Sequence, residues 1–139
     1  MNANTFFPLA TIALLAAGVA HQALSAADVE RTYQGVRYAC AGVSQESRDD
    51  PRWSGYPVKL VFAAADGGFL GDVRVKISDG TDATVLQAHC LSPWLLVDLA
   101  PGSYKVEAMA RQDYQQSFPL AVDSRHPLEH TTRFPELAN

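Results

Sequence analysis

The residues Asp72-Val73-Arg74-Val75-Lys76-Ile77-Ser78 alternate between polar and apolar side chains without a break. Successive side chains point to opposite faces only in an extended chain, so these residues predict a strand with one buried and one solvent-facing side. Burial on one side only is typical of antiparallel sheets. The alternation therefore favours an all-β fold.

Apolar residues recur with the same period of two on both sides of this strand. The stretch from Trp94 to Leu99 predicts a strand buried on both faces, because Leu95, Leu96 and Val97 leave no polar face. Asp66-Gly67-Gly68 and Ser78-Asp79-Gly80 are turn sequences that supply positive φ values. One short helix is expected over Ser44–Asp50, capped by Ser44 and ended by Pro51. Further strands are expected near 36–40, 58–62, 84–90, 104–108, 118–122 and 130–134, a pattern that indicates a β-sandwich or barrel.

The first 27 residues carry no Lys, Arg, Asp or Glu, and they contain an apolar run from Phe6 to Ala20 followed by small side chains. This pattern predicts a signal peptide over residues 1–27, cleaved between Ala20 and Ala27. The alternatives are a transmembrane anchor or a buried helix, but the run contains Pro8 and is shorter than the roughly 20 residues that span a bilayer. We therefore expect a periplasmic or secreted protein with no stable membrane span in its mature form.

Residues 28–139 are expected to form a single domain. The 139-residue chain has a formal net charge of −4, with 19% charged residues. A nucleic-acid-binding protein needs a basic face that displaces counterions from phosphates, so the charge argues against a nucleic-acid partner.

The chain has two cysteines, Cys40 and Cys90, and both lie in the predicted mature domain. Export places them in an oxidising compartment, and both are expected at strand ends with their side chains on the core face. We therefore predict a disulfide between them. The alternative is a pair of buried, reduced thiols that behave as small hydrophobic side chains.

Several motifs in residues 36–122 carry a family resemblance: Asp72-Val73-Arg74-Val75, Ser92-Pro93-Trp94-Leu95-Leu96-Val97, Leu99-Ala100-Pro101-Gly102-Ser103-Tyr104, and Gly42-Val43 with Glu46 and Arg48 upstream of Val58-Lys59-Leu60-Val61-Phe62-Ala63. In these motifs the chain resembles the carboxypeptidase regulatory-like modules of secreted bacterial proteins, and more narrowly small stand-alone periplasmic proteins. The resemblance implies a seven-stranded, Ig-like or transthyretin-like β-sandwich in which these motif residues build the core and none is catalytic.

The sequence favours no catalytic residues, no metal and no cofactor. It contains no Gly-x-Ser-x-Gly nucleophile motif, and it lacks the C-terminal Tyr-Arg-Gly-Ser of the hydroxyisourate hydrolases, which resemble transthyretin. His126 and His130 have ligand spacing only on a helix, whereas the residues after them favour a strand. His89 and Cys90 are adjacent strand residues and point to opposite faces. The alternatives to a non-catalytic module are a small-molecule hydrolase on this scaffold and an accessory or inhibitor subunit of an envelope enzyme.

The candidate binding surface comprises Glu46 and Arg48 of the predicted short helix, with Trp53 and Tyr56 of the segment that follows it. Large aromatic rings in a loop can stack on a saccharide or a protein, because a rigid ring loses little entropy on binding. The partner expected is an envelope protein or a saccharide. In the alternative interpretation, Trp53 closes one end of the sandwich and has no binding role.

Export can be tested by the intact mass of the protein recovered from the envelope fraction. We expect the mass of a chain cleaved between Ala20 and Ala27, because the small residues in this range suit signal peptidase. A full-length species embedded in the membrane would contradict the signal peptide and support an anchor.

Overall fold

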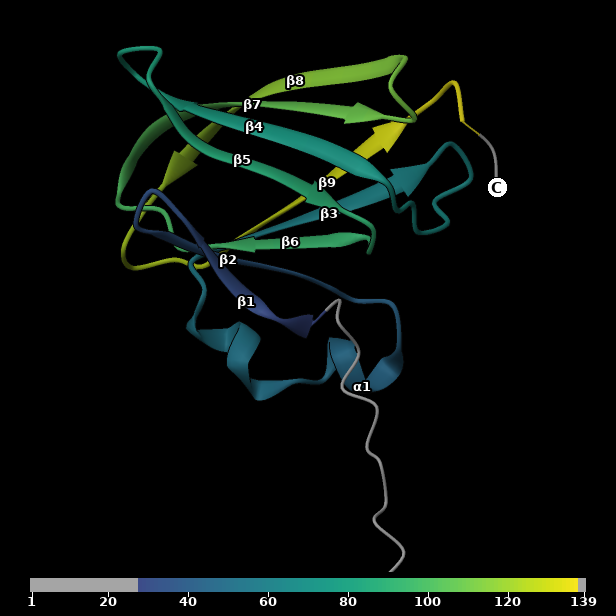
Figure 1. The fold of residues 1–139 in the computed structure, drawn as a ribbon, viewed down its shortest axis with the longest axis horizontal. Helices are drawn as coiled ribbons and strands as arrows, with labels where there is room; N and C mark the ends of the chain where they lie inside the picture. The colour runs from purple at the N-terminus through teal and green to yellow at the C-terminus, as the bar shows by residue number, and fades with distance from the viewer. Residues whose placement is uncertain (1–27, 138–139) are drawn as a thin grey trace, which may run out of the picture.

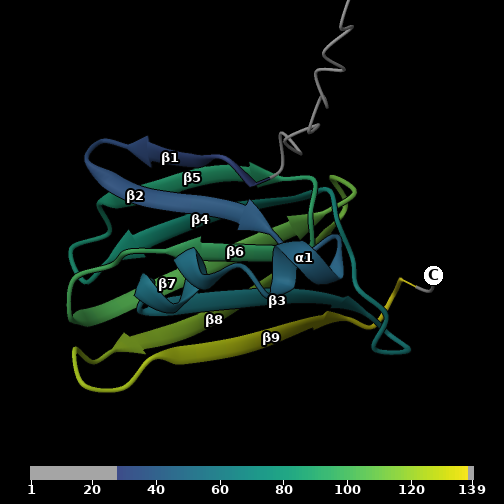
Figure 2. The same cartoon turned by 90° about the horizontal axis from the view of Figure 1, so that it is seen from below.

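The structure is a computed structural model that describes residues 28–137 (Figure 1). Two β-sheets pack face to face, and a short helical segment lies against the outer side of one of them (Figures 1 and 2). The prediction of an all-β sandwich is confirmed. The predicted signal peptide covers residues 1–27, which lie outside the described residues.

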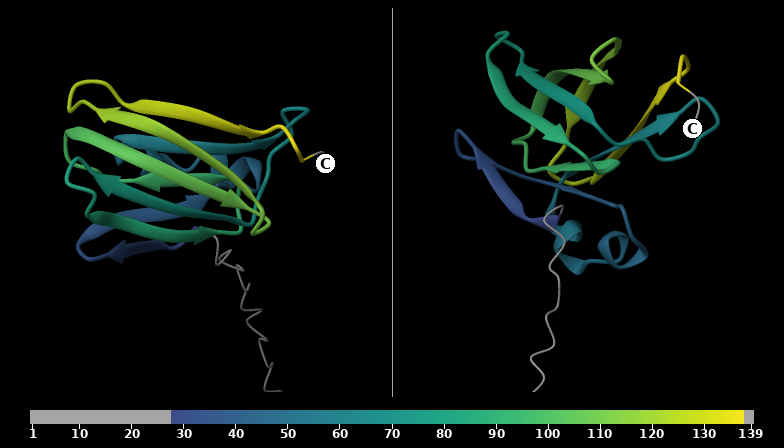
Figure 3. Two further views of the ribbon diagram at one scale, coloured as in Figure 1. Left: turned by 90° about the horizontal axis from the view of Figure 1, so that it is seen from above. Right: turned by 45° about the vertical axis from the view of Figure 1, so that its right-hand side comes forward.

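Residues 28–137 form nine strands, so the predicted number of seven is wrong. The first sheet, here sheet A, has the order β1-β2-β6-β3-β9, and the second, sheet B, has the order β5-β4-β7-β8 (Figure 3). All neighbouring strands are antiparallel except β3 and β9, which are parallel. The strands are β1 (Glu30–Tyr33), β2 (Val36–Ala41), β3 (Val58–Ala64), β4 (Val73–Asp79), β5 (Thr84–Cys90), β6 (Trp94–Val97), β7 (Gly102–Ala110), β8 (Tyr114–Val122) and β9 (Leu128–Phe134).

The sequence pattern does not reveal β1. Three of its four residues, Glu30, Arg31 and Thr32, are exposed, so they show no apolar alternation. The strand forms because Gln34 and Gly35 both adopt positive φ, 46° and 84°, and this tight turn pairs β1 with β2.

The main core lies between the two sheets and is built by the alternation that the sequence shows. Val73, Val75 and Ile77 of β4 point inward and are at most 3% exposed, while Arg74 and Lys76 point outward. Val58, Leu60 and Phe62 of β3 meet them from sheet A. Interleaved apolar side chains from the two facing sheets supply most of the hydrophobic stabilisation in a sandwich.

Two contacts link the lateral edges of the sandwich. On one side, Cys40 of β2 and Cys90 of β5 form the predicted disulfide, with their Cα atoms 5.4 Å apart. On the other side, the rings of Phe118 in β8 and His130 in β9 stack with centroids 4.0 Å apart. Burial lowers the pKa of His130, which favours the neutral imidazole in this stack.

The segment between β2 and β3 contains the predicted short helix. Helix α1 (Gln45–Arg48) begins after Ser44, whose side chain accepts a hydrogen bond from the Ser47 backbone N–H, as expected for a cap. Pro51 opens a second helical turn, the 3-10 helix η2 (Pro51–Gly55). Figure 2 shows α1 and η2 lying across β6 and β3, on the outer face of sheet A.

Reduction of the Cys40–Cys90 disulfide should lower the melting temperature by on the order of 10 °C. The bridge joins residues 50 apart in sequence, and closing such a loop restricts the unfolded chain by about 4 kcal/mol at most. Thermal melts with and without reductant measure the shift, and the Cys40→Ala/Cys90→Ala double variant is the control because it cannot respond to reductant. About two free thiols per chain in denatured, unreduced protein would contradict the bridge.

Candidate functional site

The structure places Trp53 and Tyr56 inside the protein, with 7% and 4% of their surfaces exposed. Their ring centroids are 6.1 Å apart. Together they cover a second, smaller apolar cluster on the outer face of sheet A, formed with Ala39, Ala41, Val61, Trp94 and Leu96. Trp53 therefore seals the outer face of sheet A, whereas the alternative interpretation placed it at an end of the sandwich. Neither aromatic face is open to a ligand in this arrangement.

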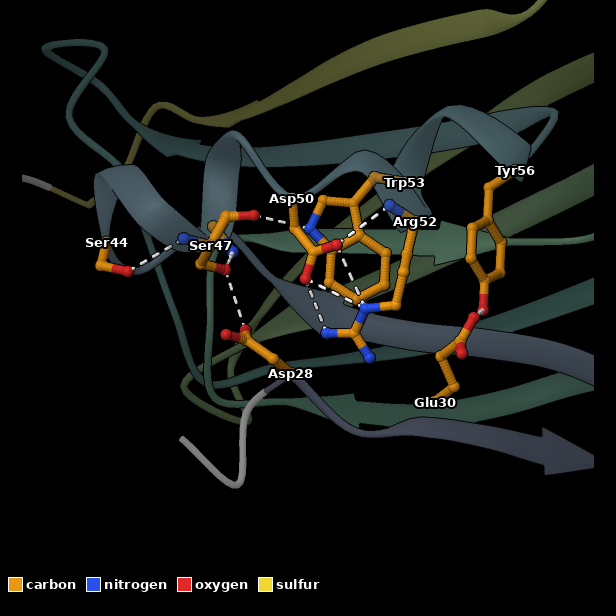
Figure 4. A network of polar contacts seen from close by, with 9 residues as sticks. Asp28, Glu30, Ser44, Ser47, Asp50, Arg52, Trp53 and Tyr56 are labelled. Carbon is orange, nitrogen blue, oxygen red and sulfur yellow. Dashed lines mark hydrogen bonds and ion pairs between the residues drawn. The ribbon is translucent and has the colours of Figure 1, made fainter. Parts of the chain in front are cut away.

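Hydrogen bonds hold both aromatic side chains in position (Figure 4). The Trp53 indole Nε1 donates to the Ser47 carbonyl oxygen at 2.6 Å, and the Tyr56 hydroxyl donates to Glu30 Oε1 at 2.7 Å. Burial, together with the Glu30 hydrogen bond, raises the pKa of Tyr56, so this hydroxyl remains a proton donor at neutral pH. Arg52, hydrogen-bonded to Asp50, lies over the Trp53 ring and lowers the pKa of the Asp50 carboxyl.

The same network attaches the first described residues to the helical segment (Figure 4). The Ser47 hydroxyl donates to Asp28 Oδ1 at 2.8 Å and accepts a hydrogen bond from the Gly42 backbone N–H at 2.7 Å. Because Glu30 receives the Tyr56 hydrogen bond, both ends of the segment contact the beginning of β1. The contacts made by Trp53, Tyr56 and Ser47 are therefore those of a structural cover.

Glu46 and Arg48, the other two predicted binding residues, lie apart from the buried rings. Glu46 is exposed and Arg48 is half-buried. The Arg48 guanidinium lies 5.3 Å from the centroid of the Phe69 ring and donates to the Gly42 carbonyl oxygen at 3.5 Å. Arg48 thus joins the loop after β2 to the loop after β3.

These loops belong to one end of the sandwich that carries exposed apolar side chains. Within residues 28–137, the large hydrophobic side chains that are exposed are Val29, Val43, Phe69 and Leu91, at 47%, 64%, 51% and 73%. The last three occupy the loops that follow β2, β3 and β5. Since Glu30 pairs with Ala39, Val29 lies level with the C-terminal part of β2, at this same end. We call this surface, with Arg48 and Glu46, the apolar loop end.

Two glycines allow the loops to pack closely at the apolar loop end. Gly42 has φ of +97°, and a Cβ there would overlap the Trp94 ring at 2.6 Å. A Cβ at Gly71 would overlap the Leu91 carbonyl oxygen, so the loop carrying Phe69 can approach the loop carrying Leu91 only with glycine at this position. The exposed side chains are thus presented by a tightly packed set of loops.

Sequence analysis missed Val43, Phe69 and Leu91 as binding candidates. Each is a single large apolar residue among turn residues, in Gly42-Val43-Ser44, Gly68-Phe69 and Cys90-Leu91-Ser92. Isolated apolar residues in turns are a usable signal, because loops over a rigid scaffold are common binding elements. Only the fold, however, shows that the three loops meet at one end.

Residues 28–137 contain no group of three or more His, Cys, Asp or Glu side chains arranged to hold a metal ion. No helix within the same range is long and apolar enough to cross a membrane. Comparisons of the chain with protein-family models and with curated proteins found no match.

Replacement of Trp53 by alanine should destabilise the protein by about 3–5 kcal/mol, the range for removing a large buried aromatic side chain. Trp53→Phe should cost less, because it keeps one aromatic ring in the cover; it loses the five-membered part of the indole and the hydrogen bond to Ser47. Urea unfolding measures both variants. Ser124→Ala, at an exposed position in the turn after β8, is the control, with an expected change within about 0.5 kcal/mol. Unaltered stability of Trp53→Ala would contradict a structural role for the ring.

Proposed function

We propose that this chain is an exported, non-catalytic β-sandwich module that binds a protein partner in the cell envelope through its apolar loop end. The resemblance to carboxypeptidase regulatory-like modules and the signal-peptide pattern of residues 1–27 support the envelope location. The observation that carries the binding role is the gathering of Val43, Phe69 and Leu91 on adjoining loops.

Exposed apolar side chains gathered on one surface are typical of protein interaction sites, because their burial against a partner is favourable. The three side chains lie beside Arg48 and the exposed Glu46, and charged groups at the rim of an interface orient the partner. A saccharide fits this surface less well. It would need several aromatic faces and polar donors, whereas Phe69 is the exposed aromatic ring of the set.

The titratable groups support a non-catalytic role. Asp50, Asp79 and Asp123 have lowered pKa values, and each is explained by hydrogen bonds from residues of its own turn: Arg52, Thr81, and Arg125 with His126. A catalytic site instead brings together a nucleophile, a base and a group that stabilises developing charge. An accessory or inhibitor subunit of an envelope enzyme would be one form of the proposed binding module.

A photo-crosslinking amino acid placed at Phe69 or Leu91 tests the apolar loop end in cells that express the full chain. We expect covalent adducts with a larger envelope protein, because both side chains are exposed and the substitutions leave the core intact. The same probe at Thr81, exposed in the β4–β5 turn, is the matched control and should give no such adduct.

Three outcomes would contradict the proposal. Adducts at Thr81 as strong as those at Phe69 would show non-specific contact. An adduct with twice the mass of the chain would show self-association in place of a partner. Turnover of 5-hydroxyisourate by the purified protein would favour the hydrolase.

A further inference from the structure

The outer face of sheet B carries a groove of about 610 Å³, within the usual range of small-molecule sites. This face lies on the opposite side of the sandwich from α1 and η2 (Figure 1). The groove shares no lining residue with the apolar loop end. It is therefore a separate candidate site, independent of the function proposed above.

Strand register brings the lining residues of the groove together. Arg74 of β4 lies between His89 of β5 and Met109 of β7, and two residues further along β4, Lys76 lies between Gln87 and Glu107. Side chains at paired positions share one face of a sheet, so these side chains form two adjoining rows. These outward-facing side chains are the polar residues of the polar–apolar alternation from which the strands were predicted.

Arg74 is the groove cation that has no carboxylate partner among residues 28–137. Glu107 lies 3.9 Å from the Lys76 ammonium and 3.5 Å from that of Lys105, so its charge is shared by two lysines. Asp72 is engaged by His89 Nε2 at 2.5 Å. An unpaired guanidinium in a concave site is a preferred partner for a carboxylate, which it binds through two parallel hydrogen bonds.

Three of the remaining lining side chains are suited to hydroxyl groups. The Gln87 and Gln115 amides each provide donors and an acceptor, and Glu107 provides a carboxylate acceptor. Tyr38 of β2 pairs with Val97 and packs against the main core, so it borders the groove at the edge of β5 and offers no ring for stacking. The amide and carboxylate groups, set among apolar side chains such as Met109, can bind several hydroxyl groups of one ligand.

We propose that this groove binds an acidic saccharide, with the sugar carboxylate on Arg74 and its hydroxyl groups on Gln87, Gln115 and Glu107. A peptide carboxylate would satisfy Arg74 equally well. The amides of Gln87 and Gln115 and the carboxylate of Glu107 favour the polyhydroxylated ligand, because each of them can bind hydroxyl groups.

The test is calorimetric titration of the full mature protein with a galacturonic acid trimer, with its neutral methyl ester as the matched ligand. We expect the ester to bind about tenfold or more weakly, the loss expected for a charge-assisted pair. Arg74→Gln should weaken binding of the acid by a similar factor and leave the ester unaffected. Arg31→Gln removes the same charge from an exposed position on β1 and should leave both ligands unaffected.

Equal binding of acid and ester, or unchanged affinity in Arg74→Gln, would overturn the proposal, as would the absence of binding by any acid. Sulfate or an acidic peptide that competes as well as the trimer would show a general anion site and would also overturn it. Thermal melts of Arg74→Gln confirm folding. Crosslinking at Phe69 in the same variant separates the two proposals, because the apolar loop end does not involve Arg74.

Discussion

Strand β6 presents apolar side chains on both faces, and this constraint shapes sheet A. Leu95 and Val97 face the main core, whereas Trp94 and Leu96 face outward. An antiparallel sheet usually exposes one face to water, but here both faces must be covered to avoid exposing large apolar surface. The segment between β2 and β3 covers the outer face of sheet A, and its Trp53 side chain packs over this face.

This constraint explains the different roles of the aromatic residues and the loops. A cover must be immobile to exclude water. Trp53 is fixed by a buried hydrogen bond to Ser47, and Tyr56 by a partly buried one to Glu30. Close packing of the cover also demands Gly42 above the Trp94 ring. Within residues 28–137, the large apolar side chains left exposed are Val29, Val43, Phe69 and Leu91, and all four lie outside the strands.

The sequence predicts those features of the fold that depend on local periodicity. It does not predict features that depend on contacts between segments far apart in the chain. Four features follow from neighbouring residues or from the number of cysteines: the alternation of β4, the burial of β6 on both faces, the Ser44 cap and the Cys40–Cys90 bridge. The exposed strand β1 does not, because its pairing comes from a turn. The sequence suggested Gly80 as the left-handed residue of the β4–β5 turn, but the structure has Asp82 in this conformation, with φ of 63°. The bulge after Ile77 shifts the register of β4 and β5 and accounts for this difference. The role of Trp53 depends on which sheet face the segment meets, and the segment's own sequence does not specify this.

The closure of the sandwich separates the groove on sheet B from the loops that carry Val43 and Phe69. The disulfide fixes β5 against β2, and the Phe118–His130 stack fixes β8 against β9, so both edges of sheet B are tied to sheet A. The outward rows of β4, β5 and β7 are therefore held by ladder hydrogen bonds and edge contacts, none of which involves α1, η2 or the loops that carry Val43 and Phe69. We therefore expect substitutions at Val43 or Phe69 to leave the spacing of Arg74, Gln87 and Glu107 unaltered. Leu91 differs from these two residues, because it directly follows Cys90 of the disulfide. Candidate surfaces on the loops and on a sheet face can in this way share one scaffold in a small domain.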